Sequence, residues 1–352
     1  MLKTAVDSCQ GMRVIDREID PAVWDRFVAR APHATFCHLS AWRGIMADTL
    51  GHETRYLVAV DEGTGDWEGV LPLVRMRAPF LGDHIISLPF LNYGGPLGSA
   101  AARRVLVRAA EAFARDVGAD TLQLRSRDAT PPGLDPLDRK ITVLLDLPES
   151  AEELWEAFPS KLRSQIRRPM KAGMETCFGP DQVEPFYEVF ARNMRDLGTP
   201  VLPRRLFHAI AERVPGATVA AVYREGRPVA AGFGFTFAGE FEITWASSLR
   251  EFSREAPNML LYWALMEHVI GQGVRVFNFG RCTPGGGTHR FKQQWGGTDV
   301  PLPWGSWARA AGQAAPSGDG RVFRLATSVW QRLPLGMANR LGPIISPRLA
   351  AF

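Results

Sequence analysis

The chain has 352 residues, of which 46% are hydrophobic and 22% are charged, and its formal net charge is +4. This hydrophobic fraction is sufficient for packed cores, which excludes a mainly disordered chain, and the length predicts about two domains. The four scattered cysteines exclude a disulfide scaffold, and the lack of a signal peptide or of an apolar run near ~18 residues predicts a soluble cytoplasmic protein.

Strand patterns alternate with helix patterns in the first part of the chain. Strands bounded by turn residues are predicted at residues 11–19, 55–61, 69–76, 84–89 and 121–125. Helices are predicted at residues 22–31, 40–49 and 101–117. The third helix is amphipathic, ends before Gly118 and leads into the last of these strands.

The second part of the chain repeats this order after an all-helical insertion. The insertion is predicted to contain helices at residues 151–172, 183–197 and 203–213. Strands follow at 219–224, 229–237, 240–247 and 275–279, with a helix at 257–270. Because helices 101–117 and 257–270 occupy matching places about 155 residues apart, we predict a duplicated α/β lobe. The predicted domains are a first lobe at 1–148, a second lobe with its insertion at 149–310, and a basic tail at 311–352.

A row of cations lies on the first helix of the insertion. Arg163, Arg167 and Lys171 are four residues apart and share one face of the helix. Guanidinium groups bind phosphate with two parallel hydrogen bonds, so this row is a candidate anion site. The alternative is a solvated face near the acidic residues that precede it.

A glycine-rich segment, FNFGRCTPGGGTHRFKQQWGG, follows the last predicted strand. Loops at the ends of core strands commonly carry ligand-binding groups, and here Arg281, Thr283, His289 and Lys292 can converge on one ligand. The segment lacks the phosphate-loop pattern and is not expected to begin a helix. The alternative is a connecting loop whose aromatic residues, including Trp295, pack on the core.

Several segments, in this order, resemble the Fem family of aminoacyl and peptidyl transferases: SKLRSQIRRPMKAG, NMRDLGTP, an apolar helix and the glycine-rich segment. The chain is most similar to the Fem-like proteins of exosortase-linked (PEP-CTERM) exopolysaccharide gene clusters, which carry a BioF2-like acetyltransferase domain. The resemblance runs from Val14 to Trp304 and includes the tail segment VWQRLPLGMANRLGP. It implies an α/β (α+β) fold of two tandem acetyltransferase-type (GNAT) lobes, each a mixed sheet flanked by helices.

The resemblance also implies a reaction, the direct transfer of an acyl or aminoacyl group to an amine or hydroxyl of an envelope or exopolysaccharide precursor. Lys292 matches the lysine of the family's FK element, which is associated with charge in the transfer site, and Trp295 matches the aromatic position after it. Arg281, Thr283 and His289 match more loosely. We therefore expect Lys292, Arg281 and His289 to be catalytic and Thr283 and Trp295 to bind substrate.

Further candidate substrate-binding residues lie outside this segment. Asn92 and Tyr93 match a family loop near the acceptor groove, and the strand that ends with Trp245 and Ser247 is expected to face that groove. In this context the arginines of the insertion become stronger candidates for phosphate binding. The additional candidates are Asn92, Tyr93, Arg163, Arg167, Trp245 and Ser247.

The donor stays open between acyl-coenzyme A and aminoacyl-transfer RNA. The chain has no segment for the long helical arm of members that use charged transfer RNA, and REFSREAP stands where an acetyltransferase carries Q/R-x-x-G-x-G/A. No permanently bound cofactor and no metal are expected, because no ligand cluster or HExxH pattern is present. The expected acceptor is a glycan, a peptide or a lipid-linked saccharide.

The tail concentrates the positive charge. Residues 320–352 contain five arginines and no acid, which leaves 4 − 5 = −1 for the rest of the chain. Because the residues outside the tail carry almost no net charge, a broad basic surface for phosphate binding is excluded, and no DNA partner is expected. Apolar residues alternate with the arginines at 321–352, so the tail is either a helix on the inner face of an anionic membrane or a strap that completes the first lobe.

Two other functions compete with the transferase. The first is a catalytically silent protein of the same fold that binds or scaffolds components of exopolysaccharide assembly. The second is an N-acetyltransferase that moves an acetyl group from coenzyme A to a small metabolite.

Overall fold

The computed structural model describes residues 11–16, 19–78, 81–137, 140–310 and 321–349, with the side chains of 321–323 left aside. The chain divides into two compact units. The first contains residues 1–138, 302–318 and 347–352, and the second contains residues 139–301 and 319–346. Each unit is a mixed sheet with helices on both faces, as predicted.

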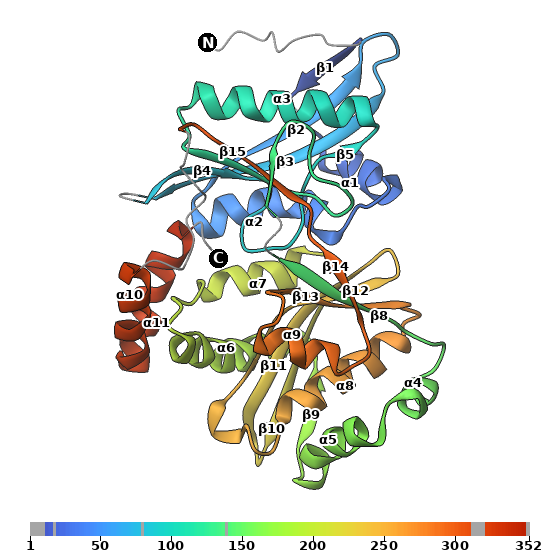
Figure 1. Ribbon diagram of the computed structural model, residues 1–352, viewed down its shortest axis with the longest axis vertical. Coiled ribbons are helices and arrows are strands. Elements are labelled where there is room, and N and C mark those ends of the chain that lie inside the picture. The colour runs from blue at the N-terminus through green and yellow to red at the C-terminus, as the bar shows by residue number, and fades with distance from the viewer. Residues whose placement is uncertain (1–10, 17–18, 79–80, 138–139, 311–320, 350–352) are drawn as a thin grey trace. The chain divides into compact units, whose positions relative to one another are not determined.

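The first unit is built around a sheet with the strand order β1-β2-β3-β4-β6-β15-β7, and β5 pairs with β3 (Figure 1). Among its described strands, β4 and β6 are the one parallel pair of neighbours. Its strands are β1 (Met12–Ile15), β2 (Glu53–Asp61), β3 (Trp67–Ala78), β4 (Gly82–Ile86), β5 (Leu97–Gly98), β6 (Thr121–Arg125), β7 (Asp135–Pro136) and β15 (Trp304–Ala308). Its helices are α1 (Pro21–Arg30), α2 (Ala41–Leu50) and α3 (Ala100–Asp116), with a 3-10 turn at Phe36–His38.

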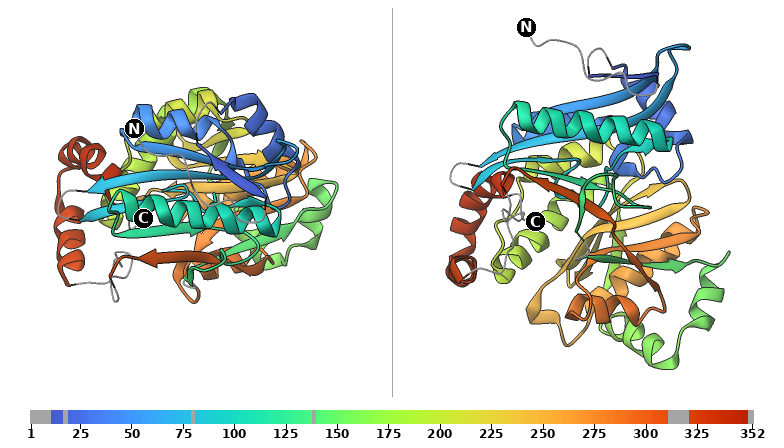
Figure 2. Two further views of the ribbon diagram at one scale, coloured as in Figure 1. Left: turned by 90° about the horizontal axis from the view of Figure 1, so that it is seen from above. Right: turned by 45° about the horizontal axis from the view of Figure 1, so that its top comes forward.

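Helices cover both faces of this first sheet. Leu57 and Ala59 of β2 belong to the core beneath α3, which lies along one face (Figure 2). Tyr56 points to the other face, because side chains alternate along a strand, and its ring lies 4.7 Å from that of Trp24 on α1. The predicted amphipathic helix is therefore α3, and it buries its apolar stripe as expected.

The second unit has the strand order β14-β8-β13-β12-β11-β10-β9. Its strands are β8 (Ile141–Asp146), β9 (Glu175–Phe178), β10 (Ala217–Arg224), β11 (Arg227–Phe237), β12 (Glu240–Ser248), β13 (Val276–Cys282) and β14 (Thr298–Pro301). Its helices are α4 (Ala151–Ala157), α5 (Ser160–Lys171), α6 (Val183–Leu197), α7 (Arg204–Arg213), α8 (Pro257–Ile270), α9 (Gly287–Gln293), α10 (Arg321–Arg332) and α11 (Leu335–Ile345). Short 3-10 turns lie at Pro180–Gln182 and Arg250–Phe252, and another at Ser346–Arg348 ends the described chain.

The two units repeat one order of elements. In the first, β2, β3 and β4 are followed by α3 and then by β6, which is parallel to β4. In the second, β10, β11 and β12 are followed by α8 and then by β13, which is parallel to β12. The duplicated α/β lobe predicted from the order of elements is confirmed.

The predicted domain boundaries, at 148 and 310, do not coincide with the units. β8 precedes residue 148, but it pairs antiparallel with β13 in the second sheet. β15 follows all strands of the second unit, but it pairs antiparallel with β6 in the first sheet. Each sheet thus contains one strand from outside its predicted domain. β8 joins the second sheet beside β13, and β15 joins the first sheet beside β6.

Two local features also differ from prediction. The helix expected at 151–172 is broken into α4 and α5 at Phe158, whose ψ of 138° is the extended conformation that a following proline favours. The glycine-rich segment does begin a helix, because Gly286 is extended at its N-cap and α9 follows directly. The dense glycines concealed the helix-compatible run from Thr288 to Gln293.

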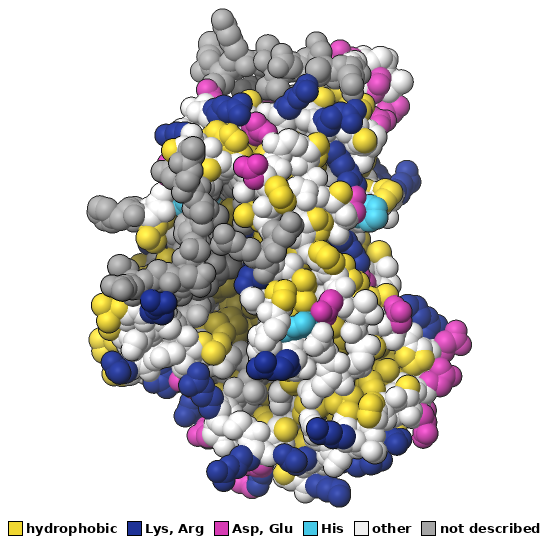
Figure 3. Space-filling model, in the orientation of Figure 1, with side chains coloured by type: hydrophobic (Ala, Val, Ile, Leu, Met, Phe, Trp, Pro, Cys, Tyr) yellow, Lys and Arg dark blue, Asp and Glu magenta, His cyan; other side chains and the backbone are white. Residues whose placement is uncertain are grey.

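The tail forms α10 and α11, which pack on α6 of the second unit. The alternative of a strap for the first unit is therefore wrong for these helices, while residues 311–320 and 350–352 of the predicted tail domain lie outside the described residues. Hydrophobic side chains are visible over α10 and α11 at the left edge of Figure 3. In the described chain, no helix combines the length and hydropathy needed to cross a membrane.

Candidate active site

The candidate site begins where two parallel strands of the second sheet part. β12 and β13 are paired only from Glu240–Val276 to Glu242–Asn278. Beyond that point β12 stays paired with β11 as far as Ser248, and β13 stays paired with β8 as far as Cys282. Backbone groups on the inner edges of both strands therefore lose their ladder partners and need others.

Asn278 fixes the point of separation. Its side chain is fully buried, and its Oδ1 accepts hydrogen bonds from the Gly280 amide (2.8 Å) and from the Thr142 hydroxyl. Its Nδ2 donates to Glu240 at 2.8 Å and, more weakly, to Glu242 at 3.5 Å. One amide thus joins β8, β12 and β13, and it holds the backbone as it turns through Gly280, whose φ is +69°.

Glu242 is the buried carboxylate at this point. It is 2% exposed, and among the described residues no other Asp or Glu is buried. Its Oε1 accepts a hydrogen bond from the Thr244 hydroxyl at 3.3 Å, and its charge acts on both Arg281 and Lys292. Glu242 was not predicted from the sequence, although a glutamate inside the apolar run of a core strand was the signal available.

Lys292 reaches this region from α9. Its Nζ donates to the carbonyl oxygens of Gly280 (2.6 Å) and Arg281 (3.0 Å), both on the part of β13 that has left β12. The side chain is 3% exposed, and this burial lowers the pKa of the ammonium to about 8, against the opposing effects of Cys282 and Glu242. Lys292 is therefore a buried cation close to its titration point at neutral pH.

Arg281 and Cys282 end β13. Burial lowers the pKa of the Arg281 guanidinium, and the charge of Glu242 opposes that shift. Burial also raises the pKa of the Cys282 thiol, which keeps it protonated and unsuited to act as a nucleophile. The end of β13 therefore offers positive charge without a thiolate.

His289 is held on both sides. Its Nδ1 accepts a hydrogen bond from the Gly285 amide (2.9 Å), and its Nε2 donates to the two carboxylate oxygens of Asp299 on β14 (3.0 and 2.9 Å). Gln293 donates to the same carboxylate at 3.3 Å. Both ring nitrogens of His289 are thus occupied within the chain, and they tie the glycine-rich loop to the sheet.

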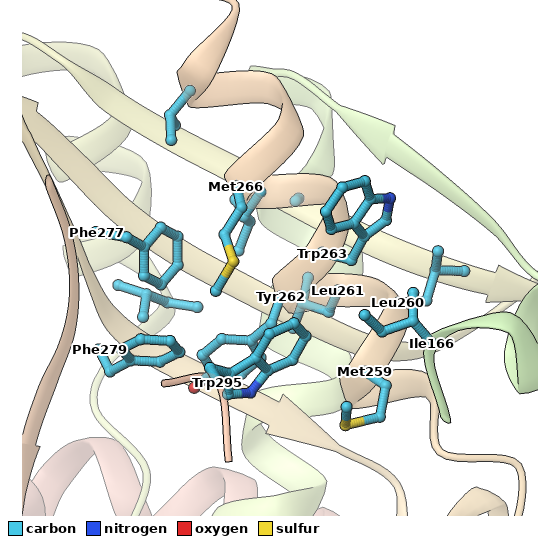
Figure 4. Close-up of a cluster of buried hydrophobic side chains, with 14 of the residues drawn as sticks. Ile166, Met259, Leu260, Leu261, Tyr262, Trp263, Met266, Phe277, Phe279 and Trp295 are labelled. Carbon is cyan, nitrogen blue, oxygen red and sulfur yellow. The ribbon is translucent and has the colours of Figure 1, made fainter. Parts of the chain in front are cut away.

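The other predicted residues of this segment are placed differently. The Thr283 hydroxyl is exposed and accepts a hydrogen bond from Lys140 at 2.7 Å. Trp295 is 1% exposed and lies in the core against Tyr262 and Phe279 (Figure 4). The competing interpretation, that the aromatic residues of the segment pack on the core, holds for Trp295.

The pair at the end of β12 faces α6 and α7. The ring of Trp245 lies 5.2 Å from that of Phe207 on α7 and 5.9 Å from that of Phe233. Ser247 is buried, and its hydroxyl accepts a hydrogen bond from Asn193 of α6 at 3.0 Å. Both residues pack the sheet against these helices.

The cation row lies on α5. Arg163 is partly buried and Arg167 is exposed, with its guanidinium 4.9 Å from the centre of the Trp155 ring. Their neighbour Arg168 donates to the carbonyl of Arg254, just before α8 begins. The row is therefore anchored near the N-terminus of α8.

Asn92 and Tyr93 are buried residues of the first unit. The carbonyl of Asn92 accepts a hydrogen bond from the Trp304 indole at 3.1 Å. The Arg127 guanidinium lies 5.6 Å from the centre of the Tyr93 ring. The structure thus gathers Lys292, Arg281 and His289 at the end of β13 in the second unit, turns Thr283 to Lys140, and places Asn92 and Tyr93 in the first unit.

No group of His, Cys, Asp and Glu in the described part of the chain has the arrangement of a metal site. The described site consists of the cations Arg281 and Lys292 and one buried carboxylate, Glu242. Fixed positive charge of this kind can stabilise negative charge that develops during a reaction.

Comparison with known proteins identifies the fold of this site. Residues 160–293 match the acetyltransferase (GNAT) domain family. No curated protein matches the chain in sequence. The structure is similar to the crystal structure of FemX, with a TM-score of 0.64 and 13% identity over 84% of this chain and 97% of that one.

Two further solved structures share the fold. One is the C-terminal domain of a putative lysylphosphatidylglycerol synthetase from Agrobacterium fabrum, with a TM-score of 0.56 and 14% identity over 87% of this chain and 95% of that one. The other is L-PGS from Bacillus licheniformis, with a TM-score of 0.55 and 13% identity over 91% and 99%. Part of the second unit therefore matches the GNAT domain family, and the chain as a whole has a tandem GNAT-like fold similar to these proteins.

Proposed function

We propose that the chain is a Fem-like acyltransferase that moves an acyl or aminoacyl group onto an amine or hydroxyl. The observation that carries this proposal is the charge cluster of buried Glu242, half-buried Arg281 and buried Lys292, which lies where β12 and β13 part inside the segment that matches a GNAT domain. A scaffold has no need to bury the carboxylate of Glu242 and the ammonium of Lys292, because burial of charge is costly unless it is paired or used.

The reaction is a direct attack. The acceptor nitrogen or oxygen forms a bond to the donor's carbonyl carbon, the bond from that carbon to the donor's sulfur or oxygen breaks, and the leaving atom takes up the proton that the acceptor loses. Arg281 and Lys292 supply the positive charge that favours the developing oxyanion. Glu242 keeps both cations charged and in position, and no covalent intermediate on the protein is required.

His289 has a positioning role in this proposal. With Nδ1 and Nε2 both bonded to Gly285 and Asp299, the ring is not available to remove a proton from the acceptor. It holds the loop between Cys282 and α9, and through α9 it fixes the place of Lys292.

The donor is an acyl-coenzyme A or an aminoacyl-transfer RNA, and both carry phosphates. Arg163 and Arg167 are positioned for those phosphates, since Arg168 of the same helix anchors the row beside the start of α8. The N-terminus of α8 adds backbone amides and the positive end of a helix dipole.

The acceptor is a glycan, peptide or lipid-linked precursor of the envelope or of an exopolysaccharide, as the Fem resemblance implies. The likeness to proteins described as lysylphosphatidylglycerol synthetases supports a lipid-linked acceptor, because that named product joins an amino acid to a lipid. Thr283, which is exposed, remains a candidate contact for the acceptor, whereas the burial of Asn92, Tyr93, Ser247 and Trp295 and the packing of Trp245 on Phe207 favour structural roles.

The test is an assay of the purified protein with acyl-coenzyme A or aminoacyl-transfer RNA and with amino-sugar, peptide and lipid-linked acceptors. We expect release of free coenzyme A or transfer RNA that depends on the acceptor. Glu242→Gln, which keeps the side-chain shape, should lower kcat by roughly a hundredfold or more. Lys161→Ala, on the opposite side of α5 from Arg163, is the control. Full activity of the Glu242→Gln protein would refute the role of the cluster.

A further inference from the structure

The helices α10 and α11 are amphipathic in an unusual sense. Small residues such as Ala338 and Gly342 face the protein, and most of the large aliphatic residues of both helices face outward. Of the exposed large hydrophobic residues in the described chain, most lie on these two helices: Leu325 (68% exposed), Val329 (53%), Met337 (51%), Leu341 (40%), Ile344 (59%) and Ile345 (37%).

The inward faces are fixed by close contacts with the end of α6 and the residues after it. Ala338 and Gly342 are buried one turn apart on α11, and a Cβ on Gly342 would lie 2.9 Å from the amide nitrogen of Val201. The Ser346 hydroxyl donates to the Val201 carbonyl at 2.9 Å. On α10, Thr327 packs against Gly198, which ends α6. These contacts define the inward face of each helix, and the exposed apolar residues lie on the other side.

The outward stripes follow helical spacing. Met337, Leu341 and Ile344 recur three or four residues apart, so they form one row along α11. Leu325 and Val329 form a corresponding row on α10. A contiguous apolar face of this kind on a soluble domain marks an interaction surface.

Exposed arginines border these rows. Arg324 and Arg332 flank the row of α10, and Arg340 lies beside the row of α11, all three of them exposed. Residues 320–352 contain no acid that would neutralise them. Figure 3 shows Lys and Arg side chains next to hydrophobic ones over these helices.

We propose that the outward face of α10 and α11 binds the surface of an anionic membrane. Large apolar side chains enter the boundary between headgroups and acyl chains, and the arginines pair with lipid phosphates. A second copy of the chain fits this face poorly, because a two-fold contact would bring arginines against arginines without an acid between them. Membrane binding here is independent of the transfer reaction, and its test needs neither donor nor acceptor.

The test is flotation of the full chain with vesicles of neutral phosphatidylcholine, alone or with about 30% of either phosphatidylserine or phosphatidylglycerol. We expect the protein to bind the anionic vesicles at least about tenfold more tightly than the neutral ones, and to be released by salt. The double variant Leu325→Asp/Leu341→Asp should bind at least about tenfold more weakly than the unaltered protein. Leu81→Asp, which changes a leucine of similar exposure in the first unit, is the matched control and should bind normally.

Several outcomes overturn the proposal. These are no binding of the unaltered protein to anionic vesicles, equal binding of the double variant, and binding that requires phosphatidylglycerol and fails with phosphatidylserine, which would indicate recognition of one headgroup. A dimer in sedimentation that Leu341→Asp dissociates would also overturn it, since a second copy would then cover this face. Arg324→Gln/Arg332→Gln/Arg340→Gln, which keeps the apolar rows, tests the charge separately and should abolish the preference for anionic lipid.

Discussion

The Nζ of Lys292 lies 2.6 Å from the carbonyl oxygen of Gly280. The lysine thus supplies a donor to a strand that has left its parallel neighbour, and it does so as a cation whose charge is opposed by burial. This combination of a structural contact and a titrating group makes pH the most informative variable for the site.

The first prediction concerns activity. Because burial lowers the pKa of Lys292 to about 8, the ammonium form is lost as the pH rises through that value. If the charge acts in the transfer, kcat should fall above about pH 8 with a single apparent pKa. The measurement is the pH dependence of kcat at saturating donor and acceptor. A rate that stays constant to about pH 10 would exclude a role for the charge.

The second prediction concerns stability and has the opposite sign. The native protein releases the Lys292 proton near pH 8, whereas the unfolded chain keeps it to about pH 10.4. Between these values the unfolded state binds more protons, so this residue makes the free energy of unfolding rise with pH, by about 3 kcal/mol in all. Lys292→Met should remove this rise, as measured by urea unfolding at about pH 7 and about pH 10. An equal rise in both proteins would contradict the assignment.

The third prediction distinguishes a structural role of His289 from a role in proton transfer. If the ring ties the loop to Asp299, both His289→Ala and Asp299→Ala should lower the free energy of unfolding by about 1–2 kcal/mol. Asp299→Asn keeps an acceptor for Nε2 and should cost less. A His289→Ala protein that loses activity while its thermal unfolding is unchanged would favour a direct catalytic role.

The fourth prediction uses two glycines of α11. A Cβ at Gly342 would meet the backbone of Val201, so Gly342→Ala should loosen α11 from the second unit and cost about 1–3 kcal/mol. Gly336 has open space around it, and Gly336→Ala should stabilise the helix by up to about 1 kcal/mol. Hydrogen exchange of α11 and thermal unfolding measure both changes. Two variants of equal stability would show that α11 does not dock as described.

The fifth prediction concerns the donor. Arg163→Ala/Arg167→Ala should raise KM for a phosphate-bearing donor by about tenfold or more, because each guanidinium contributes a charge-assisted hydrogen bond. The KM for the acceptor should be unchanged. Removal of Arg167 alone also exposes Trp155, so thermal unfolding of each variant is the control. An unaltered donor KM would indicate that Arg163 and Arg167 lie on a solvated helix face and do not bind the donor.

Much of the fold follows from local sequence patterns. The apolar stripe of 101–117 and the fully apolar run of 257–270 each specify one helix, and the order of elements around them reveals the duplication. The partners of β8 and β15 are not specified by such patterns, because strand pairing is a long-range property that a strand's own residues do not encode. The short α9 was missed for a local reason, since glycines have low helix propensity, two of them precede it and a third is its first residue.

The candidate site was predictable only in part. Lys292, Arg281 and His289 are marked by their density in one segment, and the structure gathers them at the end of β13. Glu242 lies in another strand, and its relation to Arg281 depends on how β12 and β13 pair and then separate. Trp295 shows the converse, because its position after the lysine indicated contact with substrate and its burial assigns it to the core.

The exchanged strands β8 and β15 have a consequence for biosynthesis. The first sheet lacks the strand beside β6 until residue 308 has left the ribosome, by which time every strand of the second sheet has been made. Neither half can be separated by a single cut in the gene, since a fragment ending at 148 would take β8 away from its partner β13. The two units are therefore expected to complete their folding together. Until β15 has been synthesised, the first sheet would expose the unpaired edge of β6, which chaperones can recognise.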